Sequence, residues 1–226
     1  MPRPPHRPTI HGVGDTGDAP GTLRVHRILW RTFANGPGAR AAVWVQGCRR
    51  GCPGCFNPET HDERGGRLVR IDRIARTRAE RSDDLEGLTF SGGEPLDQRD
   101  AVAELLRRVR RDTPLSTLLF TGYPWDELRT MPGIEAVLER LDVVIAGPYD
   151  RSQHTPRGLV GSAIQTVHCL TDRHTPADID TAPASEIVIA EDGSVMMTGV
   201  DPVGRRGGWG RQGVQGVQGV QGVQGV

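Results

Sequence analysis

The chain contains no lysine: its 28 basic residues are all arginines, and 28 acidic residues balance them. The formal net charge of zero provides no overall field that would attract a polyanion. We therefore expect no nucleic-acid partner.

Long apolar runs are also missing. No stretch approaches the ~18 consecutive apolar residues that a membrane-spanning helix requires, and the mean hydropathy is −0.43. The first residues lack the apolar core of a secretory signal peptide. We therefore expect a cytoplasmic protein without a membrane partner.

Cysteine is scarce, with four residues in the whole chain, but three of them cluster at Cys48, Cys52 and Cys55. Thiols stay reduced in the cytosol, so clustered cysteines there favour metal binding over disulfides. A disulfide with a spare thiol is accordingly a weak alternative. Cys169 stands alone, and we expect it to pack as a small buried hydrophobe.

The C-x3-C-x2-C spacing lets one loop present three thiolates to a small inorganic group. A structural zinc ion or iron–sulfur cluster normally has four protein ligands. Three ligands and a vacancy therefore predict a site at which another molecule binds and reacts. A Cys3His zinc site completed by His61 is the alternative.

The two ends of the chain differ in composition from its middle. Residues 1–20 are rich in proline, glycine and histidine without periodicity, which predicts disorder. Residues 204–226 form a low-complexity tail dominated by tandem Gln-Gly-Val copies. The predicted folded domain is 21–203.

Within that domain, short apolar runs alternate with helical patterns. The runs predict strands at 42–45, 88–90, 118–120 and 143–145, and the helical patterns begin at 71, 102 and 134. Such alternation predicts an α/β fold with a mainly parallel sheet. Apolar runs on either side of Asp192-Gly193 predict a C-terminal β-hairpin.

The unusual loops all follow predicted strands, at 47–55, 91–95, 121–123 and 147–149. Parallel α/β folds build their sites at the carboxyl ends of the strands, so these loops predict one site. Gly92 and Gly93 would let backbone groups approach a ligand, and Glu94 could accept hydrogen bonds from an ammonium group. An ordinary strand-to-helix turn, with Glu94 favouring the helix start and Pro95 entering it, is the alternative.

The cysteine loop followed by Gly-Gly-Glu-Pro resembles the radical S-adenosylmethionine (SAM) enzymes. The run Asn35-Gly36-Pro37-Gly38-Ala39-Arg40 is similar to the Asp/Asn-Gly-Pro-Gly-x-Arg signature of glycyl-radical-enzyme activating proteins. Four further runs look most like the activating proteins of anaerobic ribonucleotide reductase: 52–57, 120–123, 142–149 and 157–165.

The resemblance implies an incomplete (β/α) barrel of radical SAM type. Cys48, Cys52 and Cys55 would hold three irons of a [4Fe–4S] cluster, and SAM would chelate the fourth. An electron from a flavodoxin or ferredoxin-type donor would cleave SAM, and the resulting radical would abstract hydrogen from a glycine of a partner glycyl radical enzyme. No catalytic residue is implied beyond the cluster ligands.

The resemblance also assigns binding residues. Those implied for SAM are Gly92, Gly93, Glu94, Pro95, Phe56, Thr121 and Tyr123. Those implied for the incoming glycine loop are Asn35, Gly36 and Gly38, although this segment also reads as a simple turn entering a strand.

Departures from the family pattern leave rival functions open. Gly54, Ala146 and Ile164 stand where relatives often have an aromatic residue, aspartate and asparagine. One rival is a radical SAM enzyme that modifies a peptide or small molecule. Another is a non-enzymatic interaction module stabilised by a cluster or zinc.

Overall fold

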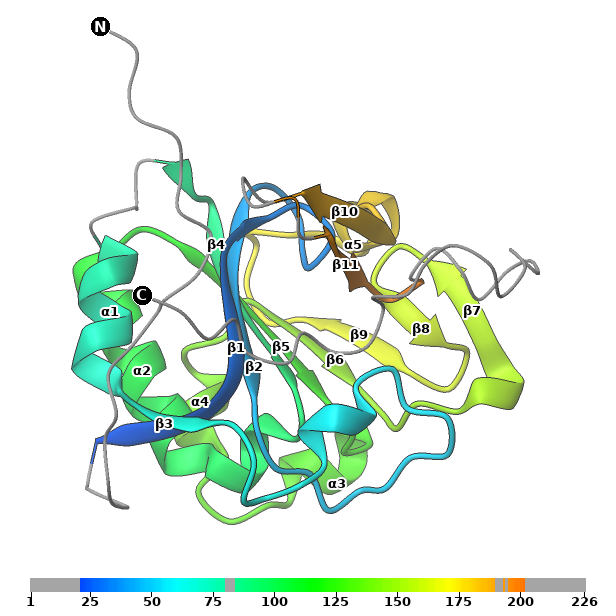
Figure 1. Ribbon diagram of the computed structural model, residues 1–226, viewed down its shortest axis with the longest axis horizontal. Coiled ribbons are helices and arrows are strands. Elements are labelled where there is room, and N and C mark those ends of the chain that lie inside the picture. The colour runs from blue at the N-terminus through cyan, green and yellow to red at the C-terminus, as the bar shows by residue number, and fades with distance from the viewer. Residues whose placement is uncertain (1–20, 80–83, 190–192, 194, 202–226) are drawn as a thin grey trace, which may run out of the picture.

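The computed structural model describes residues 21–79, 84–189, 193 and 195–201. The predicted disordered segment 1–20 and the tail 204–226 lie outside these residues. The described part contains a seven-stranded sheet, ordered β3-β1-β2-β4-β5-β6-β9, and two two-stranded sheets, β7-β8 and β10-β11 (Figure 1).

The centre of the large sheet is parallel, and its flanks are antiparallel. Its strands are β1 (Thr22–Thr32), β2 (Arg40–Val45), β3 (Arg67–Arg70), β4 (Gly87–Gly92), β5 (Ser116–Thr121), β6 (Val143–Ala146) and β9 (Thr166–Cys169). Strands β2, β4, β5 and β6 pair in parallel, whereas β1, β3 and β9 join antiparallel. The structure thus confirms a mixed α/β fold with a mainly parallel central sheet.

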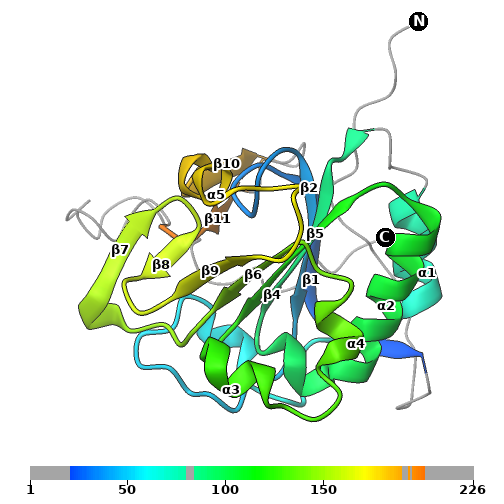
Figure 2. The ribbon, with the colours of Figure 1, turned by 180° about the vertical axis from the view of Figure 1, so that it is seen from behind.

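One face of this sheet is covered by helices. They are α1 (Ile71–Ala79), α2 (Arg99–Asp112) and α4 (Glu135–Leu138), with α3 (Trp125–Arg129) at the end of the sheet (Figures 1 and 2). In α2 the residues Val102, Leu105, Leu106 and Val109 are buried, as the predicted i, i+3, i+4, i+7 stripe requires. No helix among the described residues is both long and apolar enough to cross a membrane.

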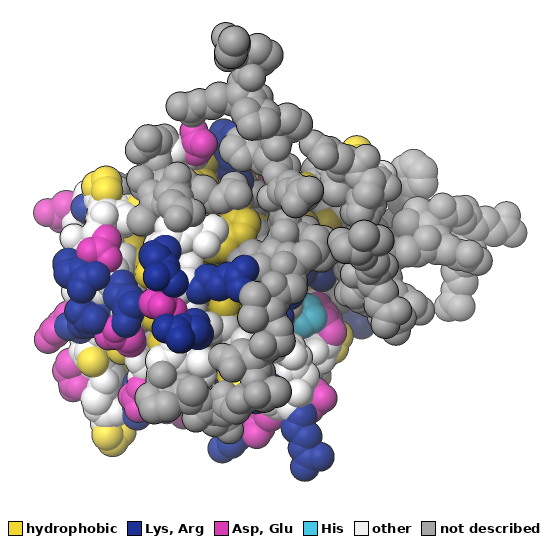
Figure 3. Space-filling model, turned by 60° about the vertical axis from the view of Figure 1, so that its left-hand side comes forward, with side chains coloured by type: hydrophobic (Ala, Val, Ile, Leu, Met, Phe, Trp, Pro, Cys, Tyr) yellow, Lys and Arg dark blue, Asp and Glu magenta, His cyan; other side chains and the backbone are white. Residues whose placement is uncertain are grey.

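The outer side of α1 and α2 is rich in arginine with acidic residues between (Figure 3). Arg70 and Arg76 both reach Asp72. Arg107 and Arg108 share Glu104 in the same manner. The arginines on this side are therefore partly neutralised by neighbours on the same or adjacent elements.

Strand β1 was not predicted, although it is the longest strand of the sheet. Its pairing with β2 is interrupted by register shifts between Val25 and Arg27 and between Leu29 and Thr32. Each irregularity breaks the two-residue alternation by which a strand is recognised. The apolar spacing that begins at 134 predicted a helix reaching 141. The structure has only the single turn of α4 there, although Ile134, Val137 and Leu141 are buried as that spacing requires.

The C-terminal elements lie on the other face of the sheet (Figures 1 and 2). They include β7 (His154–Arg157), β8 (Val160–Ser162), α5 (Pro176–Thr181), β10 (Ser185–Ile189) and β11 (Val195–Gly199). The antiparallel pairing of β10 with β11 confirms the predicted hairpin. Met196 packs against Leu29, Ala42 and Trp44 of the large sheet. Cys169 is half-buried and packs beside Leu118 and Val143.

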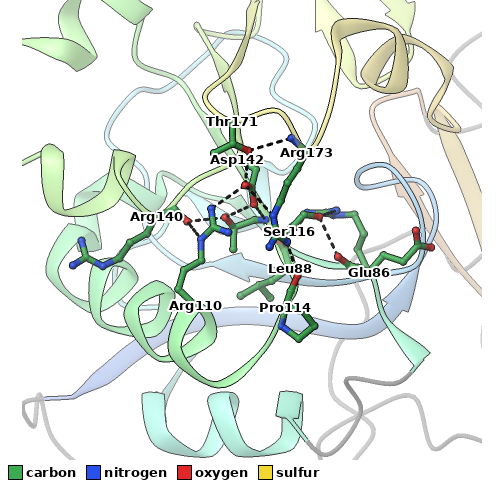
Figure 4. Close-up of polar contacts among 11 residues, drawn as sticks. Glu86, Leu88, Arg110, Pro114, Ser116, Arg140, Asp142, Thr171 and Arg173 are labelled. Carbon is green, nitrogen blue, oxygen red and sulfur yellow. Dashed lines mark hydrogen bonds and ion pairs between the residues drawn. The ribbon is translucent and has the colours of Figure 1, made fainter.

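A buried polar network joins the amino ends of β5 and β6, opposite the rim with the unusual loops (Figure 4). Asp142 is fully buried. Its Oδ1 accepts hydrogen bonds from Arg110 at 2.9 Å and from the Thr171 hydroxyl at 2.7 Å. Its Oδ2 accepts from the Thr117 amide at 2.7 Å. One carboxylate therefore connects α2, β5 and the segment after β9.

Candidate functional site

The cysteine loop begins where β2 ends and folds back on the segment that follows it. The Gly47 amide donates to the Thr60 carbonyl at 2.8 Å, and the Cys48 amide donates to the His61 carbonyl at 3.3 Å. Cys48, Cys52 and Cys55 are half-buried free thiols. One short loop thus presents three thiols.

Burial is the main factor that raises the pKa of the Cys48 and Cys55 thiols. For Cys48 the carboxylates of Glu94 and Asp97 raise it further. Both thiols therefore favour the protonated form, and binding of a cationic group would release their protons.

Three thiols in one loop are a donor set that fits an iron–sulfur cluster. Among the described residues, no group of three or more His, Cys, Asp or Glu side chains is arranged to hold one metal ion. A cubane presents a different iron to each thiolate, so its ligands need not converge on one point. His61, the zinc ligand of the alternative, has a buried Nε2 without a hydrogen-bond partner in the described structure.

The Gly-Gly-Glu-Pro loop is joined directly to the start of the cysteine loop. The Gly93 amide donates to the Val45 carbonyl and the Glu94 amide to the Gly47 carbonyl, each at 2.9 Å. A Cβ on Gly92 would lie 2.6 Å from the Val45 backbone, and one on Gly93 would lie 2.1 Å from the Gly47 oxygen. The two glycines therefore allow the backbones to touch, and Gly92, at φ +102°, also needs glycine's conformational freedom.

Glu94 is buried between three loops, with 1% of its surface exposed. Its Oε1 accepts hydrogen bonds from the Leu96 amide at 3.0 Å and the Thr121 hydroxyl at 2.9 Å. Its Oε2 accepts from the Gly122 amide at 2.7 Å. Burial raises the pKa of Glu94 to about 7 against the opposing effect of these hydrogen bonds.

These contacts confirm the alternative prediction for Glu94, and its role in binding a ligand stays a prediction. Its carboxylate caps the 3-10 helix η3 (Pro95–Gln98), which Pro95 enters as expected. The same carboxylate binds the loop after β5, through Thr121 and Gly122. Glu94 therefore organises the site by joining the loops after β4 and β5.

Arg50 is a residue of this site that the sequence did not single out. Its guanidinium lies 4.4 Å from the centre of the Tyr123 ring and 3.6 Å from the Glu127 carboxylate. It therefore links the cysteine loop to the loop after β5 and to α3. Its place between Cys48 and Cys52 was the only signal for it in the sequence.

The loop after β6 joins the other three loops through aromatic contacts. The Phe56 ring lies 4.1 Å from the Tyr149 ring and 5.7 Å from the His154 ring, measured between centroids. The Tyr149 hydroxyl lies 3.4 Å from His154 Nδ1. The structure thus brings the loops after β2, β4, β5 and β6 together at one rim.

The structure does not bring Asn35, Gly36 and Gly38 to that rim. They lie before β2, whose six residues span about 20 Å at ~3.3 Å per residue. Asn35 is buried, and its side-chain amide donates to the hydroxyls of Thr32 and Thr198, both at 2.9 Å. Added side chains at Gly36 and Gly38 would meet Arg40 and Glu86, respectively.

Comparison with known proteins extends over most of the described domain. The 4Fe-4S single cluster domain family matches residues 34–168. QueE from Escherichia coli covers 45% of this chain and 52% of its own at a TM-score of 0.35 and 12% identity, a likeness too low to support an argument.

Three anaerobic ribonucleoside-triphosphate reductase-activating proteins each match 66% of this chain. That of Enterobacteria phage T4 is 31% identical over 96% of its own length. Those of Vibrio cholerae and Escherichia coli are 34% and 30% identical over 99% of theirs. The chain therefore belongs to the anaerobic ribonucleoside-triphosphate reductase-activating protein family of radical SAM enzymes.

Proposed function

We propose that the protein is a radical SAM activating enzyme that generates a glycyl radical on an anaerobic ribonucleotide reductase. The three-cysteine loop at the carboxyl end of β2 carries this proposal, because it lies inside the matched cluster domain and is hydrogen-bonded to the Gly-Gly-Glu-Pro loop. When bound, the cluster supplies the electron that cleaves SAM reductively.

The proposed cluster ligands are Cys48, Cys52 and Cys55, which leave one iron for SAM. The proposed SAM-binding residues are Gly92, Gly93, Glu94, Pro95, Phe56, Thr121 and Tyr123. In support, Glu94 already holds the loops after β4 and β5 in register, and Phe56 brings the cysteine loop against Tyr149. A preorganised site needs little rearrangement when its ligand arrives.

The remaining assignments concern the partner side and the wider fold. We assign Asn35, Gly36 and Gly38 to contacts with the partner's glycine loop, which would have to extend from this end of β2 to the cysteine rim. A flavodoxin or ferredoxin-type protein is the proposed electron donor in the cytoplasm. We take 21–203 as one domain and its central parallel strands as an incomplete (β/α) barrel. The continuous pairing of β2, β4, β5 and β6 supports this view.

The proposal is tested by anaerobic reconstitution with iron and sulfide, followed by SAM and dithionite. The expected result is a brown protein that releases 5′-deoxyadenosine and, with the cognate anaerobic reductase, gives the electron paramagnetic resonance signal of a glycyl radical. A colourless protein with tightly bound zinc would contradict it. Release of 5′-deoxyadenosine without any radical on the reductase would instead favour a peptide or small-molecule substrate.

A further inference from the structure

The segment that follows strand β11 returns to the rim of the proposed site. There the Asp201 carboxylate lies 3.4 Å from Nε2 of His154, the first residue of β7. The Asp201 amide donates to the Ala184 carbonyl at 3.0 Å, which fixes the segment at the base of the hairpin. The His154 ring lies edge-on to the Phe56 ring, with 5.7 Å between the centroids. The end of the described chain therefore reaches the cysteine loop through one histidine.

Both ring nitrogens of His154 face oxygen atoms. Nδ1 lies 2.9 Å from the Gly161 carbonyl oxygen. Because a carbonyl oxygen only accepts, Nδ1 carries a hydrogen and donates it. The second nitrogen, Nε2, faces Asp201, and the side chains of Asp201 and His154 are only 12% and 25% exposed. This contact is therefore better shielded from water than a surface pair, and the two contacts together fix the plane of the imidazole ring.

The imidazole ring supports two aromatic side chains, which we call the Phe56–Tyr149 wall. The Phe56 and Tyr149 rings lie 4.1 Å apart, and the His154 ring is inclined to them by 72° and 69°. Phe56 also packs against β8. A Cβ added to Gly161 would lie 2.8 Å from the Phe56 ring and 3.6 Å from the Val200 side chain. The wall is therefore held by β8 and by the segment after β11.

This support comes from outside the matched cluster domain. The family model ends at residue 168, and the curated relatives match 66% of this chain over nearly all of their own length. The hairpin and α5, which follow, add no strand to the seven-stranded sheet. What this extension adds at the rim is a contact with the wall that contains Phe56, a residue that the proposed function assigns to SAM.

We propose that Asp201 and His154 are positioning residues for SAM, which hold the Phe56–Tyr149 wall in the orientation that accepts the adenine ring. Stacking of a planar base on aromatic side chains depends on the orientation of the rings. A wall that is already ordered loses little conformational freedom when the ligand arrives. This inference deepens the proposed function and rests on it, because SAM is the molecule that the proposed reaction consumes.

Three variants isolate the contact. Asp201→Ala removes the carboxylate that faces His154. Asp201→Asn is the rescuing variant, because an amide of the same shape can face a ring nitrogen with its oxygen or with its nitrogen. Asp180→Ala is the matched control: Asp180 belongs to the same extension and pairs with Arg157 at the other end of β7, at 2.6 Å.

The first measurement needs neither cluster nor SAM. The ring resonances of Phe56 are followed by nuclear magnetic resonance in the iron-free protein, with its four phenylalanines labelled and Phe56→Leu used for assignment. The adjacent Tyr149 ring shifts these resonances. Asp201→Ala should move them toward the values of a free phenylalanine, Asp201→Asn should restore them, and Asp180→Ala should leave them unchanged.

The second measurement is the dissociation constant of SAM for the reconstituted protein, with iron content and 5′-deoxyadenosine release. Asp201→Ala should raise the constant roughly fivefold to tenfold, as expected for loss of one hydrogen bond that orders the site. Iron content should not change, and kcat at saturating SAM should stay within about twofold. His154→Leu should have a similar effect, and the double variant should lose no more than the larger single loss, because both residues act through one contact.

An unchanged Phe56 resonance or unchanged SAM affinity in Asp201→Ala would overturn the proposal. Additive losses in the double variant would do so too, as would an Asp201→Asn variant as weak as Asp201→Ala. Loss of iron together with SAM affinity would assign the pair to stability of the cysteine loop instead. A wild-type protein whose SAM affinity depends on Asp201 but which releases no 5′-deoxyadenosine would refute the proposed function alone.

Discussion

Cys52 and Cys169 allow the cluster assignment to be tested at single residues. Cys52 lies in the three-cysteine loop, whereas Cys169 lies in β9 beside an apolar cluster. Cys52→Ala should abolish iron–sulfur absorbance and SAM cleavage while leaving the sheet folded, because the loop lies outside the core. Cys169→Ala should retain both. Iron analysis, visible absorbance and circular dichroism measure these outcomes, and SAM cleavage by Cys52→Ala would refute its role.

Glu94 has two separable roles, one in holding the loops after β4 and β5 together and one proposed for SAM. Glu94→Gln preserves the shape but replaces one acceptor oxygen by a donor, which should lower the free energy of unfolding by about 1–2 kcal/mol. At pH 8, above the Glu94 pKa of about 7, loss of the negative charge should also weaken binding of the SAM ammonium roughly tenfold. Calorimetric SAM titration and iron content test this, with Glu104→Gln as control.

If Glu94→Gln destabilises the protein but binds SAM with unchanged affinity, the carboxylate serves only to connect the loops.

The sequence pattern around Glu94 did not separate its structural role from its proposed role in binding SAM. Gly-Gly-Glu-Pro after a strand predicts a turn that caps a helix and also a ligand site. The burial of Glu94 depends on Thr121 and Gly122, which reach it only through the packing of β4 against β5.

At the scale of elements, the parallel strands and the loops after them were the most predictable part. The runs at 42–45, 88–90, 118–120 and 143–145 all lie within observed strands, because buried parallel strands are short, apolar and bounded by glycine or polar residues. Their shared direction then places the cysteine and Gly-Gly-Glu-Pro loops at one rim.

Strand β1 and the attachment of the hairpin could not be predicted in this way. The bulges of β1 shift its apolar residues between faces, so no single period runs through it. Asn35 is buried by Thr198, which is 163 positions away in the chain. A contact of that kind leaves no local pattern, so the sequence gave no sign that the Asn35 side chain is buried.

Substitution of Gly93 tests the backbone contact between the loops that follow β2 and β4. Gly93→Ala places a Cβ against the Gly47 carbonyl, which forces the residue before Cys48 to move. We expect the reconstituted variant to hold less iron and to cleave SAM more slowly, with the sheet still folded. Gly133→Ala is the control, because nothing lies within 4 Å of its Cβ position, although its φ of +73°, unlike that of Gly93, disfavours a side chain. Full iron content in Gly93→Ala would contradict the expectation.

At the scale of the whole molecule, Asp142 connects elements at the end of the sheet away from the cysteines. Burial alone would raise its pKa, but hydrogen bonds from Thr171, the Thr117 amide and Arg110 outweigh burial and lower the pKa below 3.8. A lowered carboxyl pKa contributes stability above the unfolded pKa, and this contribution is lost as the pH falls through the folded pKa.

Asp142→Asn should therefore lower the free energy of unfolding by about 2–3 kcal/mol at neutral pH, because charge-assisted hydrogen bonds are lost. The difference from wild type should narrow as the pH falls below about 4. Urea unfolding of both proteins between pH 7 and pH 3 measures it. A difference that stays constant over this range would contradict the assigned pKa shift.

The separate pairing of β10 with β11 has a consequence for how this protein can change over time. Substitutions on the outer side of the hairpin leave the hydrogen bonding of the seven-stranded sheet intact. The sequence of this hairpin's outer side can therefore change, in evolution or by engineering, with little effect on the rim that carries the cysteine loop. The outer side of β10–β11 can thus vary in sequence while the strands that carry the cysteine loop keep their pairing.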